Sequence, residues 1–149
     1  MDPVKKNAIK TFFEIVQKLK DEEIIRSSKY SGDIAEYICQ ELYSLTLSPS
    51  QREVGYDGKD ENEIRYQIKL NNSTQKTNQE VGDPTSYDNL LLVVTSDSLL
   101  FDSRYETAFI LIYNIPSSQL NGIWLAKSVL HSFQPDKMLD RNLNAHIIE

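Results

Sequence analysis

The sequence predicts a single α/β domain in which a central mixed β-sheet of four to five strands is flanked by helices. Apolar residues recur at helical spacing from Ile9 to Leu19 and again from Ile34 to Leu45. From Ile64 to Leu70, apolar and polar residues alternate as they do in a strand with one buried face. Residues 89–95 and 108–115 are apolar runs of strand length, which is typical of central strands covered on both faces.

Length and composition favour one soluble domain over residues 1–149. A chain of 149 residues, 40% of them hydrophobic, is long enough to bury its own core. No apolar run approaches the roughly 20 residues that span a bilayer, and the N-terminus lacks the apolar stretch of a signal peptide. The single cysteine, Cys39, excludes an internal disulfide and is expected to be a small buried hydrophobe. We therefore expect a cytoplasmic protein without membrane contact.

Charge and motif content narrow the function classes. The 16 basic and 22 acidic residues give a net charge of -6, which counts against a nucleic-acid binder unless the basic residues gather on one face. His131 and His146 have no cysteine or acidic partner at ligand spacing, which argues against zinc. With five glycines and no Gly-rich loop, nucleotide-triphosphate chemistry has no support.

The first helix is predicted at about residues 3–26. Asp2 is an N-cap candidate, and Pro3 suits the first helical position. We expect this helix to have a structural role, with its apolar side packed on the domain. Residues 27–31 are expected to be a linker.

The second helix is predicted to begin near Gly32 or Asp33. Its apolar stripe consists of Ile34, Ala35, Ile38, Cys39, Leu42 and Leu45. At about 100° per residue, Glu36 lies just off the edge of this stripe, so its carboxylate would sit at the shoulder of the core.

The stretch from Gly55 to Lys69 predicts a strand, an exposed turn and a second strand. The turn is expected at Lys59 to Glu63, because these residues are polar and charged. In the second strand, Gln67 and Lys69 lie on the polar face. Folding back at the turn would bring Asp57 close to both of them.

The remaining connections are less clearly patterned. Residues 71–87 are polar and longer than most connections in compact domains, so this loop is either functional or mobile. Residues 96–107 form an edge strand or a short helix. A helix is expected from Pro116 to Leu130, with Trp124 in its core in preference to a role as an interface anchor. The tail, residues 134–149, is expected to end in another short helix.

The order of these segments resembles the PD-(D/E)xK nuclease superfamily, which has the restriction-endonuclease-like fold. A helix with Glu36 comes first, then a strand with Asp57, then a strand with Gln67 and Lys69, and then a buried strand. The segments that carry the resemblance are GDIAEYI (32–38), GYDG (55–58), YQIK (66–69) and NLLLVV (89–94). In that family the residue two before the lysine is usually Asp or Glu. Gln67 in this position is similar to the Q-x-K motif of the Mrr-like branch.

Each of these residue types suits a task in phosphodiester hydrolysis. Asp57 would bind Mg²⁺, or Mn²⁺ in its place, directly, while Gln67 would offer its side-chain carbonyl and Glu36 would bind through water. The family resemblance further implies the backbone carbonyl of Ile68 as a ligand. Lys69 would orient or deprotonate the attacking water and balance developing negative charge.

Simpler structural roles remain open for the same residues. Glu36 comes three positions after Asp33, the spacing of a capping box, so it could tie down a helix start. Asp57 in YDG suits a turn. Gln67 and Lys69 alone would be the solvated face of an amphipathic strand.

The predicted function is that of a metal-dependent DNA endonuclease in restriction, defence or DNA repair. In the loop 71–87, Lys76, Asn78 and Gln79 are the predicted DNA contacts, because amides and ammonium groups suit base edges and phosphates. A homodimer is expected, since cutting both strands of a duplex with one site per chain favours two-fold symmetry. The alternative is a catalytically inactive protein that keeps this fold as a binding or regulatory subunit, in a larger defence complex.

Overall fold

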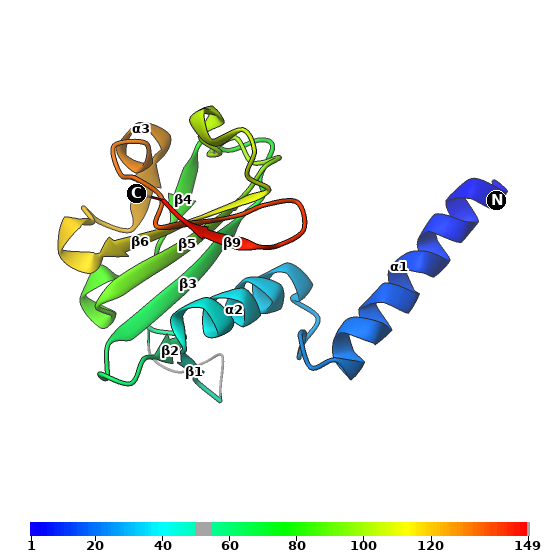
Figure 1. The fold of residues 1–149 in the computed structure, drawn as a ribbon, viewed down its shortest axis with the longest axis horizontal. Helices are drawn as coiled ribbons and strands as arrows, with labels where there is room; N and C mark the ends of the chain where they lie inside the picture. Colours follow the sequence, from blue (N-terminus) through cyan, green and yellow to red (C-terminus); the bar gives the residue numbers. More distant parts are fainter. Residues whose placement is uncertain (50–54, 149) are drawn as a thin grey trace.

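The computed structural model describes residues 1–49 and 55–148, and within them seven strands form one mixed sheet (Figure 1). Its spatial order is β1-β2-β3-β5-β6-β8-β9. The strands are β1 (Thr46–Leu47), β2 (Gly58–Lys59), β3 (Arg65–Asn71), β5 (Asn89–Thr95), β6 (Ile110–Pro116), β8 (Lys137–Leu139) and β9 (Ala145–Ile147). β3 and β5 run parallel, and the other neighbouring pairs are antiparallel.

The mixed α/β class is confirmed, but the predicted number of strands is wrong. Four of the seven strands, β1, β2, β8 and β9, have only two or three residues each. Such short segments carry too little alternation to be recognised, and they are strands because a longer neighbour offers them backbone hydrogen bonds.

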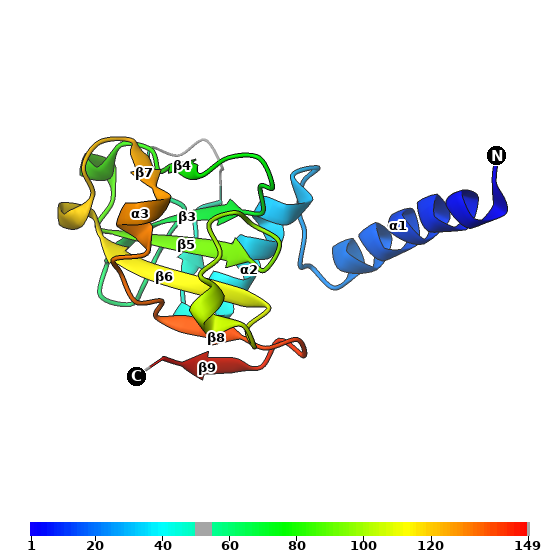
Figure 2. The same cartoon turned by 90° about the horizontal axis from the view of Figure 1, so that it is seen from above.

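Two layers cover the central sheet (Figures 1 and 2). Helix α2 (Tyr30–Tyr43) packs on one face, where Ala35 and Cys39 join Leu91 and Val93 in one apolar cluster. The opposite face carries a small antiparallel sheet of β4 (Asn78–Glu80) and β7 (Trp124–Ala126), with the short helix α3 (Lys127–Leu130) directly after β7. Because β5 is buried by both layers, all of its central residues are apolar.

Helix α1 (Pro3–Asp21) begins where it was predicted, but it ends before the predicted residue 26 and packs little on the domain. The carboxylate of Asp2 accepts a hydrogen bond from Val4 N–H, which confirms the N-cap. The helix ends at Asp21, and Glu23 shortly afterwards adopts a positive φ of 59°. Val16 is the one buried residue of the helix, and α1 points away from the sheet in both views (Figures 1 and 2). No helix in the described part of the chain is long and apolar enough to cross a membrane.

Two helices predicted in the C-terminal third are wrong. Between Pro116 and Leu130 the chain forms a 3-10 turn (Ser117–Gln119), strand β7 and then α3, with Gly122 at a φ of 82° where a helix could not continue. The tail forms the β8–β9 hairpin, and the carboxylate of Asp140 closes its turn by accepting from the N–H groups of Asn142 and Asn144. Long-range pairing with β6 decides this outcome.

Other local predictions had mixed outcomes. Residues 96–107, predicted as an edge strand or a short helix, contain a 3-10 helix (Ser103–Tyr105) capped by Asp102. Cys39 is fully buried as expected, and burial raises the pKa of its thiol to about 12. Trp124 is not a core residue, because it lies on β7 with 55% of its surface exposed.

Candidate functional site

The β2–β3 hairpin places the predicted site residues. Gly58 pairs with Tyr66 and Lys59 with Arg65, and Asp60 closes the turn by accepting from Ile64 N–H. Along β3 the predicted alternation is confirmed, with Tyr66 and Ile68 buried against α2. Gln67 and Lys69 therefore project from the other face of the strand.

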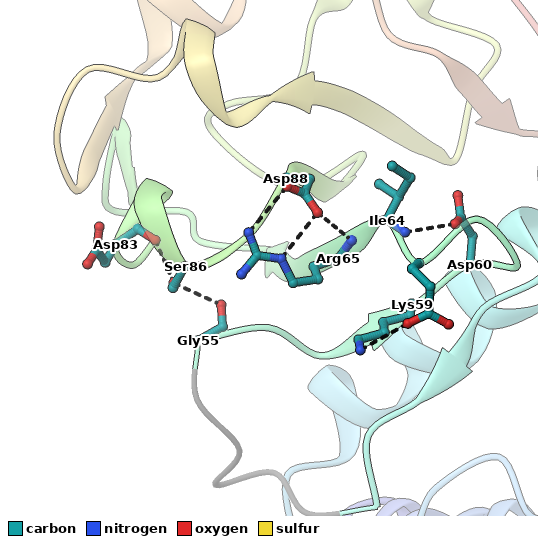
Figure 3. A network of polar contacts seen from close by, with 9 residues as sticks. Gly55, Lys59, Asp60, Ile64, Arg65, Asp83, Ser86 and Asp88 are labelled. Carbon is teal, nitrogen blue, oxygen red and sulfur yellow. Dashed lines mark hydrogen bonds and ion pairs between the residues drawn. The ribbon is translucent and has the colours of Figure 1, made fainter.

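An ion pair fixes the start of β3 against β5. The carboxylate of Asp88 accepts from the backbone N–H of Arg65 at 2.8 Å and from its guanidinium at 3.2 Å (Figure 3). These bonds hold the pKa of Asp88 below its usual range. Asp88 N–H also donates to the Arg65 carbonyl, so backbone and side chain lock the same position.

Just before the hairpin, the backbone at Gly55 lies in close contact with Ser86. Its carbonyl accepts a hydrogen bond from the hydroxyl of Ser86, which also donates to the carbonyl of Asp83 (Figure 3). Gly55 has a φ of 82°, and a Cβ here would lie 2.3 Å from Ser86 Oγ. Only glycine fits this position, which leads the chain to Asp57 two residues later.

Asp57 is joined to β3 by both backbone and side chain. Its N–H donates to the carbonyl of Tyr66 at 2.7 Å, and its Oδ2 accepts from the N–H of Ile68 at 2.7 Å. The side-chain carboxylate of Asp57 thus accepts the hydrogen bond that a backbone carbonyl of the neighbouring strand would otherwise accept from Ile68. Because the N–H and C=O of one strand residue point to the same edge, the carbonyl of Ile68 points to the same edge of β3 as the N–H that Asp57 accepts from.

Burial raises the acid pKa of Asp57. Its pKa lies above the ordinary value although the Ile68 N–H, Lys69 and Arg26 each lower it. A largely desolvated carboxylate with incomplete compensation is a group that a bound cation would stabilise.

Glu36 belongs to the same electrostatic neighbourhood. Its Oε2 lies 3.1 Å from the guanidinium of Arg26. Burial raises the pKa of Glu36 despite this bond, and the charge of Asp57 raises it further. The structure therefore brings the helix carboxylate and the hairpin carboxylate close enough to influence each other.

The capping-box interpretation of Glu36 is wrong. Asp33 lies inside the first turn of α2, whose N-cap is Lys29. The Asp33 carboxylate accepts from the backbone N–H groups of Arg26 and Ser27, so it anchors the segment that precedes the helix. Glu36 pairs with Arg26 instead.

Lys69 has an acidic partner that sequence reasoning missed. Its ammonium nitrogen lies 3.5 Å from Oε2 of Glu80 on β4, whose other oxygen accepts from the N–H of Gly82. Glu80 is one carboxylate in a polar loop, and no spacing rule relates it to Lys69. The ammonium of Lys69 is thus paired with Glu80, while its charge lowers the pKa of Asp57.

The three predicted DNA-contact residues have different environments. Lys76 and Asn78 are exposed, and Asn78 begins β4. The amide of Gln79 is used internally, because it accepts from Asn71 at 2.8 Å and donates to the carbonyl of Glu80. Gln79 therefore supports the loop from inside.

Two hollows flank the site. One, of about 340 Å³, is lined by Arg26, Asp33 and Glu36 at the end of α2. The other, of about 360 Å³, lies between the end of β3 and β4 and is lined by residues that include Lys76 and Glu80. Neither is lined by Asp57, which is half-buried.

The donor set fits a hard divalent cation. Two carboxylates, the Gln67 amide and the Ile68 carbonyl supply oxygen ligands of the kind that Mg²⁺ prefers. In the described ranges 1–49 and 55–148, no group of three or more His, Cys, Asp or Glu side chains is arranged to hold a metal. The candidate set contains only two such side chains, so it depends on the amide, the carbonyl and water to complete coordination.

Comparison with known proteins does not assign the chain to a family, because no protein-family model and no curated protein matches it.

Proposed function

We propose that this protein is a Mg²⁺-dependent DNA endonuclease with a PD-(D/E)xK-type site of the Mrr-like, Q-x-K form. The observation that carries the proposal is the bond between Asp57 Oδ2 and Ile68 N–H, in the middle of the Gln67-Ile68-Lys69 stretch. It puts the carboxylate beside the carbonyl of Ile68 and within the electrostatic reach of Lys69. The charge of Asp57 raises the pKa of Glu36, which supports Glu36 as the fourth residue of the proposed site.

The residues of the chain would divide the work of binding the cation and activating water. Asp57, Gln67 and the Ile68 carbonyl would hold the cation, and Glu36 would contact it through water. When bound, the cation supplies a more acidic water and neutralises charge on the phosphate oxygens. Lys69 would orient the attacking water and stabilise the negative charge that develops on the phosphorane oxygens. The pairing of Lys69 with Glu80 keeps the ammonium on this face of β3.

A second candidate, a binding or regulatory subunit of a larger defence complex, has one specific observation in its favour. Glu80 already neutralises Lys69, and Gln67 brings no charge to the metal ligands. A catalytically inactive site would be compatible with a lysine whose charge is neutralised by a neighbouring carboxylate of the same chain. The two functions differ in one outcome, since both bind DNA but only the first cleaves it.

The test incubates the purified protein with supercoiled, linear and branched DNA in Mg²⁺, Mn²⁺ or EDTA. Lys69→Ala and Asp57→Asn should each lower the cleavage rate by about 100-fold or more. Lys59→Ala, on a surface lysine of the same hairpin, and Asp83→Asn, in an exposed turn, are matched controls that should cleave normally. Equal cleavage by all variants would attribute the activity to a contaminant. DNA binding without cleavage in either metal would favour the second candidate.

Dimer formation belongs to the same proposal. Each chain would supply one site, so cutting both strands of a duplex in one encounter favours two chains in two-fold arrangement. Double-strand breaks whose yield depends on protein concentration would support this expectation, and single nicks alone would count against it.

A further inference from the structure

Trp124 occupies an unusual place for the one tryptophan of this chain. It lies on β7, directly opposite Glu80 of β4, and 55% of its surface is exposed. Side chains directly opposite each other in an antiparallel pair share a face, with Cβ atoms about 4.5–5.5 Å apart. The indole therefore lies beside the carboxylate that pairs with Lys69.

Trp124 and Glu80 line the same hollow of about 360 Å³. The other groups that matter there are the ammonium of Lys76, the hydroxyl of Ser73 and the exposed amide of Asn78. An aromatic surface beside hydrogen-bonding groups is the combination that recognises a planar, polar ring. The volume lies within the range of small-ligand sites, about 300–1,000 Å³.

The walls of the hollow are held by hydrogen bonds, one of which is buried. Asn71 is buried and donates to Gln79, and its carbonyl oxygen accepts from Ser98 Oγ at 2.6 Å. Ser73 Oγ accepts from the N–H of Lys76, and the Ser73 carbonyl accepts from the N–H of Leu99. The loop 71–87 is thus built into the domain near the hollow, so a ligand would meet a formed surface.

We propose that this hollow binds an unpaired nucleobase of the DNA strand whose phosphodiester lies at Lys69, with Trp124 stacking on the base. The inference rests on the proposed endonuclease function and names its substrate class as DNA with unpaired nucleotides, at a branch, flap or single-stranded segment. Lys76 on the rim supplies the charge for the adjoining phosphate, and the amide of Asn78 suits a base edge. In intact duplex the bases are stacked on one another and cannot reach the indole.

The sole tryptophan makes the test direct. Fluorescence of the full chain is titrated in EDTA with single-stranded, branched and fully duplex oligonucleotides, and binding is followed in parallel by anisotropy of a labelled strand. We expect the emission to be quenched by the first two and little changed by the duplex. Trp124→Ala should weaken single-strand binding by about 5- to 150-fold, and Trp124→Phe by less, because a smaller aromatic ring still stacks.

Ile123→Ala is the matched control, since Ile123 is 49% exposed and lines a different hollow. It should bind as the wild type does. Circular dichroism of Trp124→Phe and Trp124→Ala checks that β7 is intact. Equal affinity of wild type and both Trp124 variants would overturn the inference, as would equal quenching by heparin, a polyanion without bases.

Failure of this inference and failure of the proposed function give different results. Quenching by single strands in a protein that cleaves nothing would support the base site and reject the endonuclease. Cleavage that depends on Lys69 but leaves the emission of Trp124 unchanged would support the endonuclease and overturn the base site.

Discussion

Helices α1 and α2 are both amphipathic, but α2 buries its apolar face against the sheet while α1 presents much of its own to solvent. In α2, Ala35 is 1% exposed and Cys39 is fully buried. In α1, Phe12 is 49% exposed and Phe13 is 62% exposed. The Phe12 ring touches only the rings of Phe13 and Tyr30 among the described aromatic contacts.

The difference lies in how each helix is connected to the rest of the domain. α2 is anchored at its start by Asp33 and leads into Leu45 and β1, which joins the sheet edge. α1 is joined to the domain through the segment after Asp21 and meets little of the core. A helical period decides which side of a helix is apolar, but the rest of the chain decides what that side meets.

The largest expected effect tests the surface on which α2 packs. Leu91→Ala would leave a cavity between β5 and α2, because Leu91 is fully buried in the cluster with Ala35 and Cys39. We expect a loss of about 2–5 kcal/mol in the free energy of unfolding, measured by urea denaturation. A loss below about 1 kcal/mol would show that α2 does not pack on this face.

The next effect tests the anchor of α2. Asp33→Ala removes the acceptor for the N–H groups of Arg26 and Ser27 in a buried position. The expected loss is about 1–3 kcal/mol in the free energy of unfolding. Asp21→Ala is the matched control on α1, where the carboxylate accepts from Gln17 at the surface. Equal losses from both variants would remove the contrast between the helices.

A third prediction concerns the face of α2 that carries the candidate site. Burial raises the pKa of Glu36, so the native state binds this proton more tightly than the unfolded chain does. The contribution of Glu36 to stability therefore declines as the pH rises above its ordinary pKa of 4.5. Glu36→Gln removes this decline. The urea concentration at the unfolding midpoint of Glu36→Gln should rise relative to that of the wild type as the pH goes from about 4 to 8. A difference that stays constant over this range would contradict a raised pKa of Glu36 in the folded state.

The smallest expected effect tests α1. Phe13→Ala should change the free energy of unfolding by no more than about 0.5 kcal/mol, because the side chain is largely in solvent already. The measurement is the same urea titration. A loss above about 1 kcal/mol would show that α1 has a packing partner in solution and would bring the two helices closer in character.

Local patterns predicted the parts of the site that lie close together in the sequence. The alternation in β3 separated Gln67 and Lys69 from the buried Tyr66 and Ile68, and the polar turn predicted that Asp57 would return to β3. These features depend on strand geometry and turn chemistry over a few residues. Arg26 and Glu80, the partners of Glu36 and Lys69, were not predicted, since each lies ten or more positions away in sequence.

Residue patterns alone were sufficient for the α/β class, the central strands, both long helices and the polar face of the hairpin. These depend on periodicity, which is a property of neighbouring residues. Tertiary contacts were needed to turn parts of residues 116–130 and of the tail into strands, to leave α1 with an exposed apolar face, and to bring Trp124 opposite Glu80. Those outcomes depend on pairing between segments that are distant in the sequence, and a local residue pattern carries no information about such pairing.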